Sequence, residues 1–299
     1  MRSGENGPGM SYPPGFLPDL RRIRAWPNPT GGLLTGSLWR SPGLARLTYG
    51  ALADLVQRTM GPSPGRILYV GSGLGHIALE LARAGNDVTG VDADAESVAL
   101  ARKAAEEDPF PDHRGDLSYQ IAEFPHGFRS DGGYDRVLFS RVLHHIPDPA
   151  GAVRRAAELL SPHGTLVCVE FAHDRLGSSG ARWMAGRRMW LSRSGWWAEP
   201  LAGSVDREAE RVAEDWRKDH EEERLNPLGA MLGPLRRRFH LTDLTWHPYL
   251  FWDLAAEMTV PPGQEEPVAH RLRDEEERAI QEGRVDGVLF STTGTPRAT

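Results

Sequence analysis

Three glycines between a short apolar stretch and a helical pattern limit the possible folds of this chain more than any other part of it. They lie in the sequence Gly71-Ser-Gly-Leu-Gly75. Residues 66–70 precede them and are continuously apolar after the first, which predicts a buried strand, whereas apolar side chains recur at helical spacing over residues 76–84. Glycines at such a junction allow a tight turn and a close approach of the backbone to a ligand. The loop therefore predicts a ligand-binding α/β protein.

An alternation of strands and helices surrounds this loop. Apolar stretches predict strands at 87–91, 117–121, 134–139 and 165–171, and helical spacing predicts helices at 44–60, 95–107 and 150–160. Continuous apolar strands that alternate with helices are typical of a mostly parallel sheet covered on both faces. Two late strands, at 241–252 and 285–293, are expected to form an antiparallel pair. We therefore predict an α/β, Rossmann-like sheet of seven strands.

The spacing of polar residues around the loop indicates which cofactor it suits. Asp92 ends the next strand, 21 residues after Gly71, where a carboxylate can accept hydrogen bonds from a ribose diol. A dinucleotide fingerprint requires a glycine at the sixth position of the loop. That position holds His76, and the third glycine comes one residue early, at Gly75. The pattern disfavours a nicotinamide oxidoreductase and suits a non-phosphate group, such as the methionine part of S-adenosylmethionine.

Four stretches, at 67–75, 88–92, 134–148 and 160–166, resemble the motifs of class I S-adenosylmethionine-dependent methyltransferases of the small-molecule type, in the same order and spacing. The resemblance implies S-adenosyl-L-methionine as the cofactor. It implies cofactor contacts from Tyr69, Gly71, Ser72, Gly73, Gly75, His76, Asp92, Ala93, Ala122, Glu123, Phe124, Ser140 and Arg141. Tyr69 departs from the family, which usually has an acidic residue there that helps to order the loop and the ammonium end of the cofactor.

Three histidines are candidates for a general base that removes a proton from the methyl acceptor. His144 and His145 leave the fourth strand at the edge where ligands bind in parallel sheets, and His173 follows the fifth strand at the same edge. Asp174 could orient His173. The alternative for the first pair is a packing and hydrogen-bonding role in the loop, and for His173 a solvent-exposed position.

The chain is expected to have four parts: a tail and helical strap (1–60), the cofactor-binding core (61–174), a helical lid (175–237) and the last two strands (238–299). The lid is tryptophan-rich, and it is expected to decide the substrate. The predicted substrate contacts are Trp183, Arg187, Trp190, Trp196 and Trp197, with packing of the lid as the alternative. The arginines at 182, 187, 188 and 193 could attract an acidic or phosphorylated acceptor or form a helix surface, and Trp39 and Arg40 could complete the lid. The charged residues of the helix at 206–225 are interpreted as a solvated face.

Composition excludes several classes of protein. Lys and Arg number 35 against 41 Asp and Glu, and the net charge of −6 argues against nucleic acid as a partner. The single cysteine, Cys168, excludes an internal disulfide and a multi-cysteine metal site, and no His, Asp and Glu cluster has metal-ligand spacing. No apolar run approaches the roughly 18 residues of a membrane span, and residues 1–10 lack the apolar stretch of a signal peptide. We expect a cytoplasmic protein with a small-molecule substrate, no metal and no membrane contact; the oligomeric state is left open.

These observations predict methyl transfer from S-adenosylmethionine to a small or medium-sized organic acceptor, at oxygen or nitrogen, in bacterial specialised metabolism. Two alternatives remain open. The same fold could catalyse a non-methylating reaction such as a cyclisation, an alternative that the missing acid at Tyr69 motivates. It could also serve as a non-catalytic binding subunit that keeps the pocket.

Overall fold

The computed structural model of the protein describes residues 38, 41–108 and 114–297. The predicted tail over residues 1–36, and Trp39 and Arg40 of the predicted lid, lie outside the described residues.

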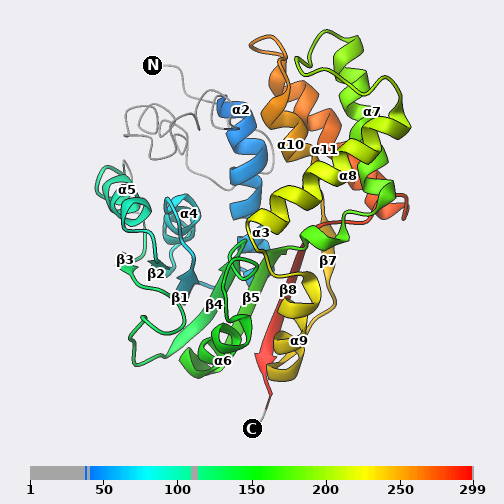
Figure 1. Ribbon diagram of the computed structural model, residues 1–299. Helices are drawn as coiled ribbons and strands as arrows, with labels where there is room; N and C mark the ends of the chain where they lie inside the picture. The colour runs from blue at the N-terminus through cyan, green and yellow to red at the C-terminus, as the bar shows by residue number, and fades with distance from the viewer. Residues whose placement is uncertain (1–37, 39–40, 109–113, 298–299) are drawn as a thin grey trace.

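A single mixed sheet forms the centre of the molecule (Figure 1). Its strands are β1 Arg66–Val70, β2 Asp87–Asp92, β3 Leu117–Ile121, β4 Tyr134–Ser140, β5 Leu160–Phe171, β6 Phe239–Leu241, β7 Thr245–His247 and β8 Leu289–Pro296. Five parallel strands run in the order β3-β2-β1-β4-β5, and the antiparallel β8 continues the sheet beside β5. β6 and β7 both pair with β8. The predicted Rossmann-like parallel sheet is confirmed.

Helices cover both faces of the sheet. They are α2 Pro42–Ala45, η2 Arg46–Gly50, α3 Ala51–Met60, α4 His76–Arg83, α5 Ala95–Glu106, α6 Pro149–Leu159, η4 His173–Arg175, α7 Ser178–Arg193, α8 Val205–Glu222, α9 Leu228–Arg238, α10 Leu250–Glu257 and α11 Glu265–Gln281. Apolar side chains of α3, α4 and α5 share one buried cluster with alternate strand residues such as Ile67 and Leu138. Those of α6 and α9 share a second cluster with Leu68, Phe139 and Cys168 on the opposite face. Both faces are therefore buried, as the continuous apolar strands predict.

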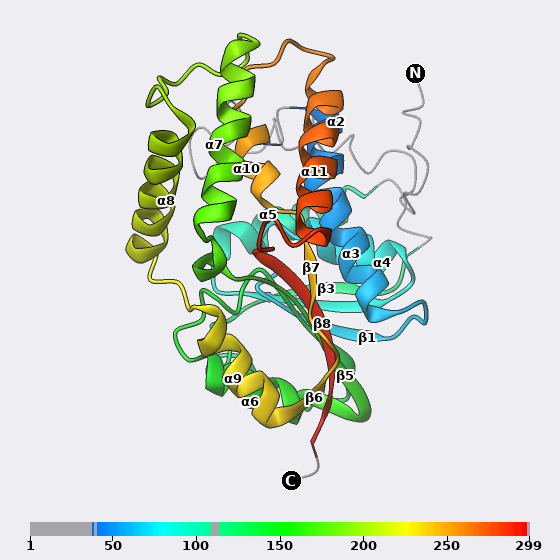
Figure 2. The same cartoon turned by 90° about the vertical axis from the view of Figure 1, so that its right-hand side faces the viewer.

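Beyond the end of β5, α7, α8, α10 and α11 form a layer that we call the helical layer (Figure 2). Two contacts fasten it to the sheet. Trp216 of α8 donates its indole N–H to the carbonyl of His173, at 2.8 Å. The side-chain amide of Asn226, in the connection after α8, donates to the carbonyls of Leu143 and Ile146 in the loop after β4, at 3.1 and 2.7 Å. The helical layer therefore lies against the edge of the sheet where the parallel strands end.

The C-terminal part differs from the sequence prediction at one element. The single strand expected over 241–252 is replaced by β6, β7 and the helix α10, which begins two residues after Pro248. Proline cannot donate a backbone hydrogen bond and rarely continues a strand inside a sheet. The sequence prediction also has no counterpart for α9, which lies within the range of the predicted lid but packs against α6.

Candidate functional site

The glycine loop lies between β1 and α4 and is held against the end of β2. The backbone N–H groups of Gly71 and Ser72 both donate to the carbonyl of Val91, at 2.8 and 3.1 Å. Gly71 has φ +69°, and a Cβ there would come within 2.2 Å of a methyl carbon of Val142. The first glycine is therefore required by both conformation and space.

Gly73 differs from Gly71 because its surroundings are open. It has φ +51°, and a Cβ at this position would meet no atom of the described chain within 4 Å. Gly75 then ends the loop as the N-cap of α4, whose first-turn amides point toward the loop. The middle of the loop thus exposes backbone to a space that a ligand can occupy.

Asp92, the last residue of β2, accepts two backbone hydrogen bonds. Gly73 donates to one carboxylate oxygen at 2.7 Å, and Asp94 donates to the other at 3.0 Å. Each oxygen keeps a further lone pair for a ligand. Asp92 therefore both orders the glycine loop and presents the acceptor that a ribose diol requires.

Apolar surface lies on the β3 side of Asp92. Ile121 is paired with Asp92 in the sheet and is 52% exposed, which is unusual for a large apolar side chain. Ala93 and Glu123 are exposed, Ala122 is half-buried, and the ring of Phe124 is buried against Phe128 and Phe139. An exposed isoleucine beside these residues suits a flat apolar group such as a nucleobase. Ile121 was not among the predicted contacts, although its place at the end of a strand could have indicated it.

Several polar atoms around the glycine loop are buried without a hydrogen-bond partner in the described chain. They include the hydroxyl of Ser72. Tyr69 is buried as well, and this burial raises the pKa of its hydroxyl well above the usual range. Burial, and then the charge of Arg141, lower the pKa of His76 to about 3. The two residues that flank the glycine loop, Tyr69 and His76, are therefore neutral side chains.

Arg141 places a positive charge beside these neutral groups. It follows β4 with φ +52°, in the left-handed region that non-glycine residues rarely adopt. Its guanidinium carbon lies 5.0 Å from the ring centre of Trp252 and 5.9 Å from those of Tyr49 and Tyr249. Its Nη1 is buried and has no hydrogen-bond partner among the described residues. A buried cationic donor in this state suits the carboxylate of a bound ligand.

Glu170, near the end of β5, organises the loop that carries His144. One oxygen of this buried carboxylate accepts from the backbone of Val142 and Leu143, at 2.8 and 2.6 Å, and the other lies 2.7 Å from Nδ1 of His144. Burial alone would raise the pKa of Glu170, but His144 and the two amides outweigh it and hold the pKa below its usual value. The structure thus gives His144 a hydrogen-bonding role in the loop, the alternative that the sequence left open.

The other two histidines differ in position. His145 is exposed, and burial of part of its ring and the neighbouring His144 lower its pKa. His173 stacks on His220 with ring centres 5.2 Å apart, and burial, followed by His220, lowers its pKa. No hydrogen bond joins Asp174 to His173 among the described residues, and one oxygen of Asp174 accepts the backbone N–H of Leu228 at the start of α9.

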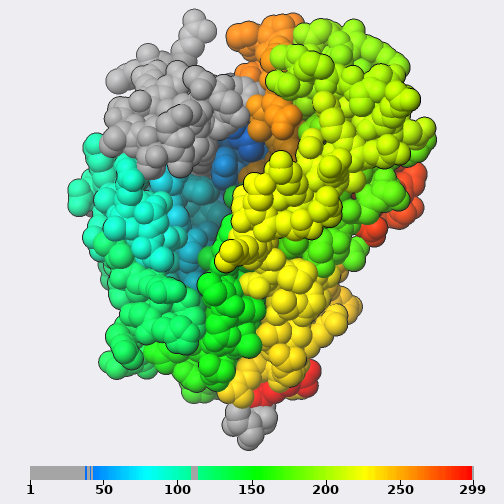
Figure 3. All heavy atoms as spheres, in the orientation of Figure 1, coloured from blue at the N-terminus to red at the C-terminus, as the bar shows by residue number. Residues whose placement is uncertain are grey.

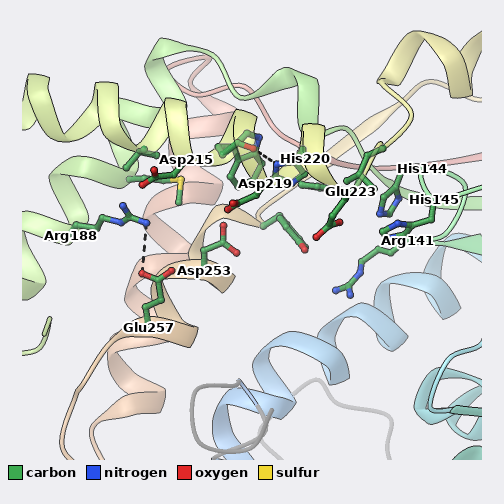
Figure 4. Close-up of a pocket in the computed structure, with 16 residues that line it drawn as sticks. Arg141, His144, His145, Arg188, Asp215, Asp219, His220, Glu223, Asp253 and Glu257 are labelled. Carbon is green, nitrogen blue, oxygen red and sulfur yellow. Dashed lines mark hydrogen bonds and ion pairs between the residues drawn. The ribbon is translucent and has the colours of Figure 1, made fainter. Parts of the chain in front are cut away.

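A cavity of about 370 Å³ lies between the loop after β4 and the helical layer (Figure 4). It is lined by Arg141, His144, His145, Phe171, Met184, Arg188, Val212, Asp215, Trp216, Asp219, His220, Glu223, Leu225, Tyr249, Asp253 and Glu257. The surface is hollowed between α8, drawn in yellow, and the blue and cyan residues (Figure 3). His144, His145 and Arg141 are thus brought together at one wall, and α8 and α10 form the others.

The predicted substrate contacts of the lid lie elsewhere. Trp183, Arg187, Trp190, Trp196 and Trp197 do not line this cavity. Trp183 and Trp197 are buried in the core, and Trp190 and Trp196 pack edge to face. The arginines of α7 are also engaged, since Arg182, Arg187 and Arg188 form ion pairs with Asp206, Glu275 and Glu208. These residues therefore pack the helical layer together, which the sequence could not distinguish from contact with a substrate.

Of the residues of the helical layer that line the cavity, Arg188 belongs to the predicted arginine cluster, whereas the acidic ones were not predicted as site residues. Asp215, Asp219 and Glu223 recur every four residues at the cavity side of α8, where the sequence indicated a solvated face. The spacing was visible, but α10, which faces them, was expected as a strand. Within the part of the chain that the structure describes, no group of His, Cys, Asp and Glu could hold a metal ion, and no helix has the length and apolar character needed to cross a membrane.

Comparison with known proteins identifies the family. Residues 44–226 match the family model of a methyltransferase domain, and the chain belongs to this family. It is similar to the ubiquinone biosynthesis O-methyltransferases of Cronobacter sakazakii, 34% identical over 122 residues, and of Sodalis glossinidius, 38% identical over 111 residues. These matches cover 40% and 37% of this chain, and 48% and 43% of the relatives, so the chain matches about half the length of these proteins.

Two solved structures share the fold over most of the chain. The geranyl diphosphate C-methyltransferase of Streptomyces coelicolor A3(2) superposes with a TM-score of 0.53 and 14% identity, covering 91% of this chain and 86% of that structure. The [4+2]-cyclase SpnF superposes with a TM-score of 0.51 and 19% identity, covering 83% and 81%. Both similarities support the class I methyltransferase fold.

Proposed function

We propose that the protein transfers a methyl group from S-adenosylmethionine to a small organic acceptor. The observation that carries this proposal is the arrangement at the edge of the sheet, where the open glycine loop and Asp92 adjoin a cavity across Arg141. When bound, the cofactor supplies an activated methyl group. The residues around it bind and orient: Asp92 would hold the ribose, Ile121 the adenine, and Arg141 the methionine carboxylate.

The chain's contribution to the reaction is mainly positioning. Holding two reactants in line can account for roughly 7–11 kcal/mol of a reaction barrier. The helical layer would exclude water and orient the acceptor against the cofactor site. His145 is the histidine best placed to accept a proton, because it lines the cavity and makes no side-chain ion pair with the described residues, whereas Nδ1 of His144 is engaged by Glu170.

A non-methylating reaction in the same site is the second candidate, since buried, neutral Tyr69 stands where the family usually has an acid. Transfer of a tritiated methyl group to any acceptor from a panel of small phenols, alcohols and amines would favour methylation. Binding of S-adenosylhomocysteine with no transfer to any of them would favour the alternative.

Binding is tested by titration calorimetry of the protein with S-adenosylhomocysteine and, separately, with NAD. We expect only the first to bind, and no binding of it would overturn the proposal. Asp92→Ala should weaken binding by about 1.5–3 kcal/mol, the range for a hydrogen bond to a charged group. Glu96 is exposed and lies two residues beyond Asp94. Glu96→Gln is therefore the matched control and should leave the affinity unchanged.

A further inference from the structure

The wall of the cavity formed by α8 and α10 is acidic. Five carboxylates line it, from Asp215, Asp219, Glu223, Asp253 and Glu257, against two cationic groups, Arg141 and Arg188. Arg188 is itself paired, with Glu208 at 3.3 Å and with Glu257 at 3.7 Å. The carboxylates therefore outnumber the cations that remain available to them.

Four of these carboxylates have no partner of their own. Asp215, Asp219 and Glu223 are exposed and Asp253 is half-buried, and none of the four makes a side-chain hydrogen bond or ion pair with any residue that the structure describes. Asp219 on α8 and Asp253 on α10 face each other across the cavity (Figure 4). The pKa of Asp253 is raised to about 7, mainly by burial, and repulsion from Glu257 and Asp219 adds to this effect.

A second feature places the proposed cofactor at one end of the same cavity, so that the cavity lies where a methyl acceptor would have to bind. The buried Nη1 of Arg141 lines the same cavity and lacks a hydrogen-bond partner in the described chain. A buried cationic donor without a partner costs free energy unless a ligand supplies an acceptor. Arg141 adjoins the glycine loop, so a hydrogen-bond acceptor of the cofactor is expected at that end of the cavity. At the other end, between α8 and α10, the carboxylates favour a cation.

The remaining walls suit the body of an amine-bearing molecule. Trp216, Tyr249, Phe171 and His220 contribute aromatic rings to the lining. Phe171 and Tyr249 lie against each other with ring centres 4.8 Å apart, and Trp216 and His220 with ring centres 4.6 Å apart. Such rings bind apolar surface and attract cations through their faces.

We propose that the methyl acceptor is a small molecule with a protonated amine, whose ammonium group lies between Asp219 and Asp253. The proposal rests on the proposed methyltransferase function and adds the chemical class of the acceptor. An ammonium group would offset part of the negative charge of the two facing carboxylates and could donate hydrogen bonds to both. An acidic or phosphorylated acceptor, which the arginines of the sequence had suggested, would instead meet uncompensated negative charge.

Calorimetry with matched probes tests this class. The probes are tyramine and glucosamine, each compared with the counterpart that lacks the ammonium group, 4-ethylphenol and glucose, and 4-hydroxyphenylacetate serves as an anion. Each is titrated into the protein with and without saturating S-adenosylhomocysteine. We expect at least one amine to bind about tenfold or more tightly than its counterpart, with an affinity that falls as salt is added. Equal or tighter binding of the uncharged or anionic probes would overturn the proposal, as would no binding of either amine.

Variants separate a specific site from general attraction to an acidic protein. Asp219→Asn and Asp253→Asn should each weaken binding of the amine about tenfold or more. Glu210→Gln, on the opposite side of α8, removes the same charge and should have no effect. Amine binding that survives both asparagine variants would contradict the site. If the wild-type protein does not bind S-adenosylhomocysteine, the methyltransferase proposal is overturned. If it binds S-adenosylhomocysteine but does not prefer the amines, only the proposed class of acceptor is overturned.

Discussion

A single buried carboxylate, Glu170, determines the shape of the loop that separates the cofactor site from the cavity. It accepts the backbone N–H groups of Val142 and Leu143 and engages Nδ1 of His144. Val142 is also the residue against which Gly71 packs. One side chain on β5 therefore fixes the glycine loop and the cavity wall relative to each other.

This role predicts a loss of stability with a specific dependence on pH. Glu170→Gln removes the charge that both amides and His144 favour, and should lower the free energy of unfolding by about 1–3 kcal/mol at pH 7. Because the pKa of Glu170 is lowered in the fold, its contribution is present above the usual value of 4.5 and is lost as the pH falls through the folded-state pKa. Urea unfolding at pH 7 and at successively lower pH should show the two proteins converging in acid.

The exposed Glu158, paired with Arg155 on the surface of α6, provides the matched control. Glu158→Gln should change stability by less than about 0.5 kcal/mol at every pH. A Glu170→Gln protein as stable as the wild type at pH 7 would mean that the carboxylate does not hold the loop.

At the scale of elements, the sequence predicts the parts of the fold that local pattern determines. The strand, loop and helix around Gly71 are predicted correctly because apolar periodicity and glycine both act within a few residues. The helix α10 is not predicted correctly, for two reasons. Residues 250–257 include aromatic side chains that favour strands, and the side chain that caps the start of the helix is distant in the sequence. Glu276 of α11 accepts the backbone N–H groups of Tyr249, Leu250 and Phe251, at 2.8 to 2.9 Å.

The acidic residues of α8 are exposed, as the sequence indicates, and they also line the cavity, which the sequence does not show. Carboxylates at every fourth position look the same in a sequence whether they face water or a second helix. Only the placement of α10 opposite Asp219 shows that they line a cavity. Local pattern therefore predicts the glycine loop and the place of Asp92 at the end of β2, whereas the lining of the cavity depends on tertiary packing.

The cap on α10 can be tested directly. Glu276→Gln keeps one acceptor oxygen but turns an amide N–H₂ toward a backbone donor, so at least one of the three hydrogen bonds should be lost. We expect a decrease in stability of about 1–3 kcal/mol. Hydrogen exchange at Tyr249, Leu250 and Phe251 should become faster. Glu277→Gln, the exposed neighbour on the same helix, should leave these amides unchanged, and equal protection in both variants would refute the capping role.

At the scale of the whole molecule, the proposed site consists of two parts, one inside and one outside the residues that match the family. The glycine loop, Asp92 and Arg141 lie within residues 44–226, which match the methyltransferase domain. Beyond that match lie Asp253 and Glu257 on α10, and Tyr249, its N-cap. The glycine loop, Asp92 and Arg141 therefore lie inside the family match, whereas α10 supplies a wall of the cavity that lies outside it.

An acidic wall without a bound cation should lower the stability of the whole molecule, and this effect depends on pH. The pKa of Asp253 is raised to about 7 from a usual 3.8, so its contribution to stability is full below the usual value and is lost as the pH rises through 7. Asp253→Asn cannot ionise. Relative to the wild type, it should therefore gain about 1–3 kcal/mol in the free energy of unfolding between pH 4 and pH 8. Urea unfolding of both proteins measures this difference in the free energy of unfolding. The other titrating groups are the same in both proteins, so their contributions largely cancel. Glu210→Gln should show no such trend, and Asp253→Asn curves parallel to those of the wild type would mean that Asp253 ionises freely and that the cavity needs no cation.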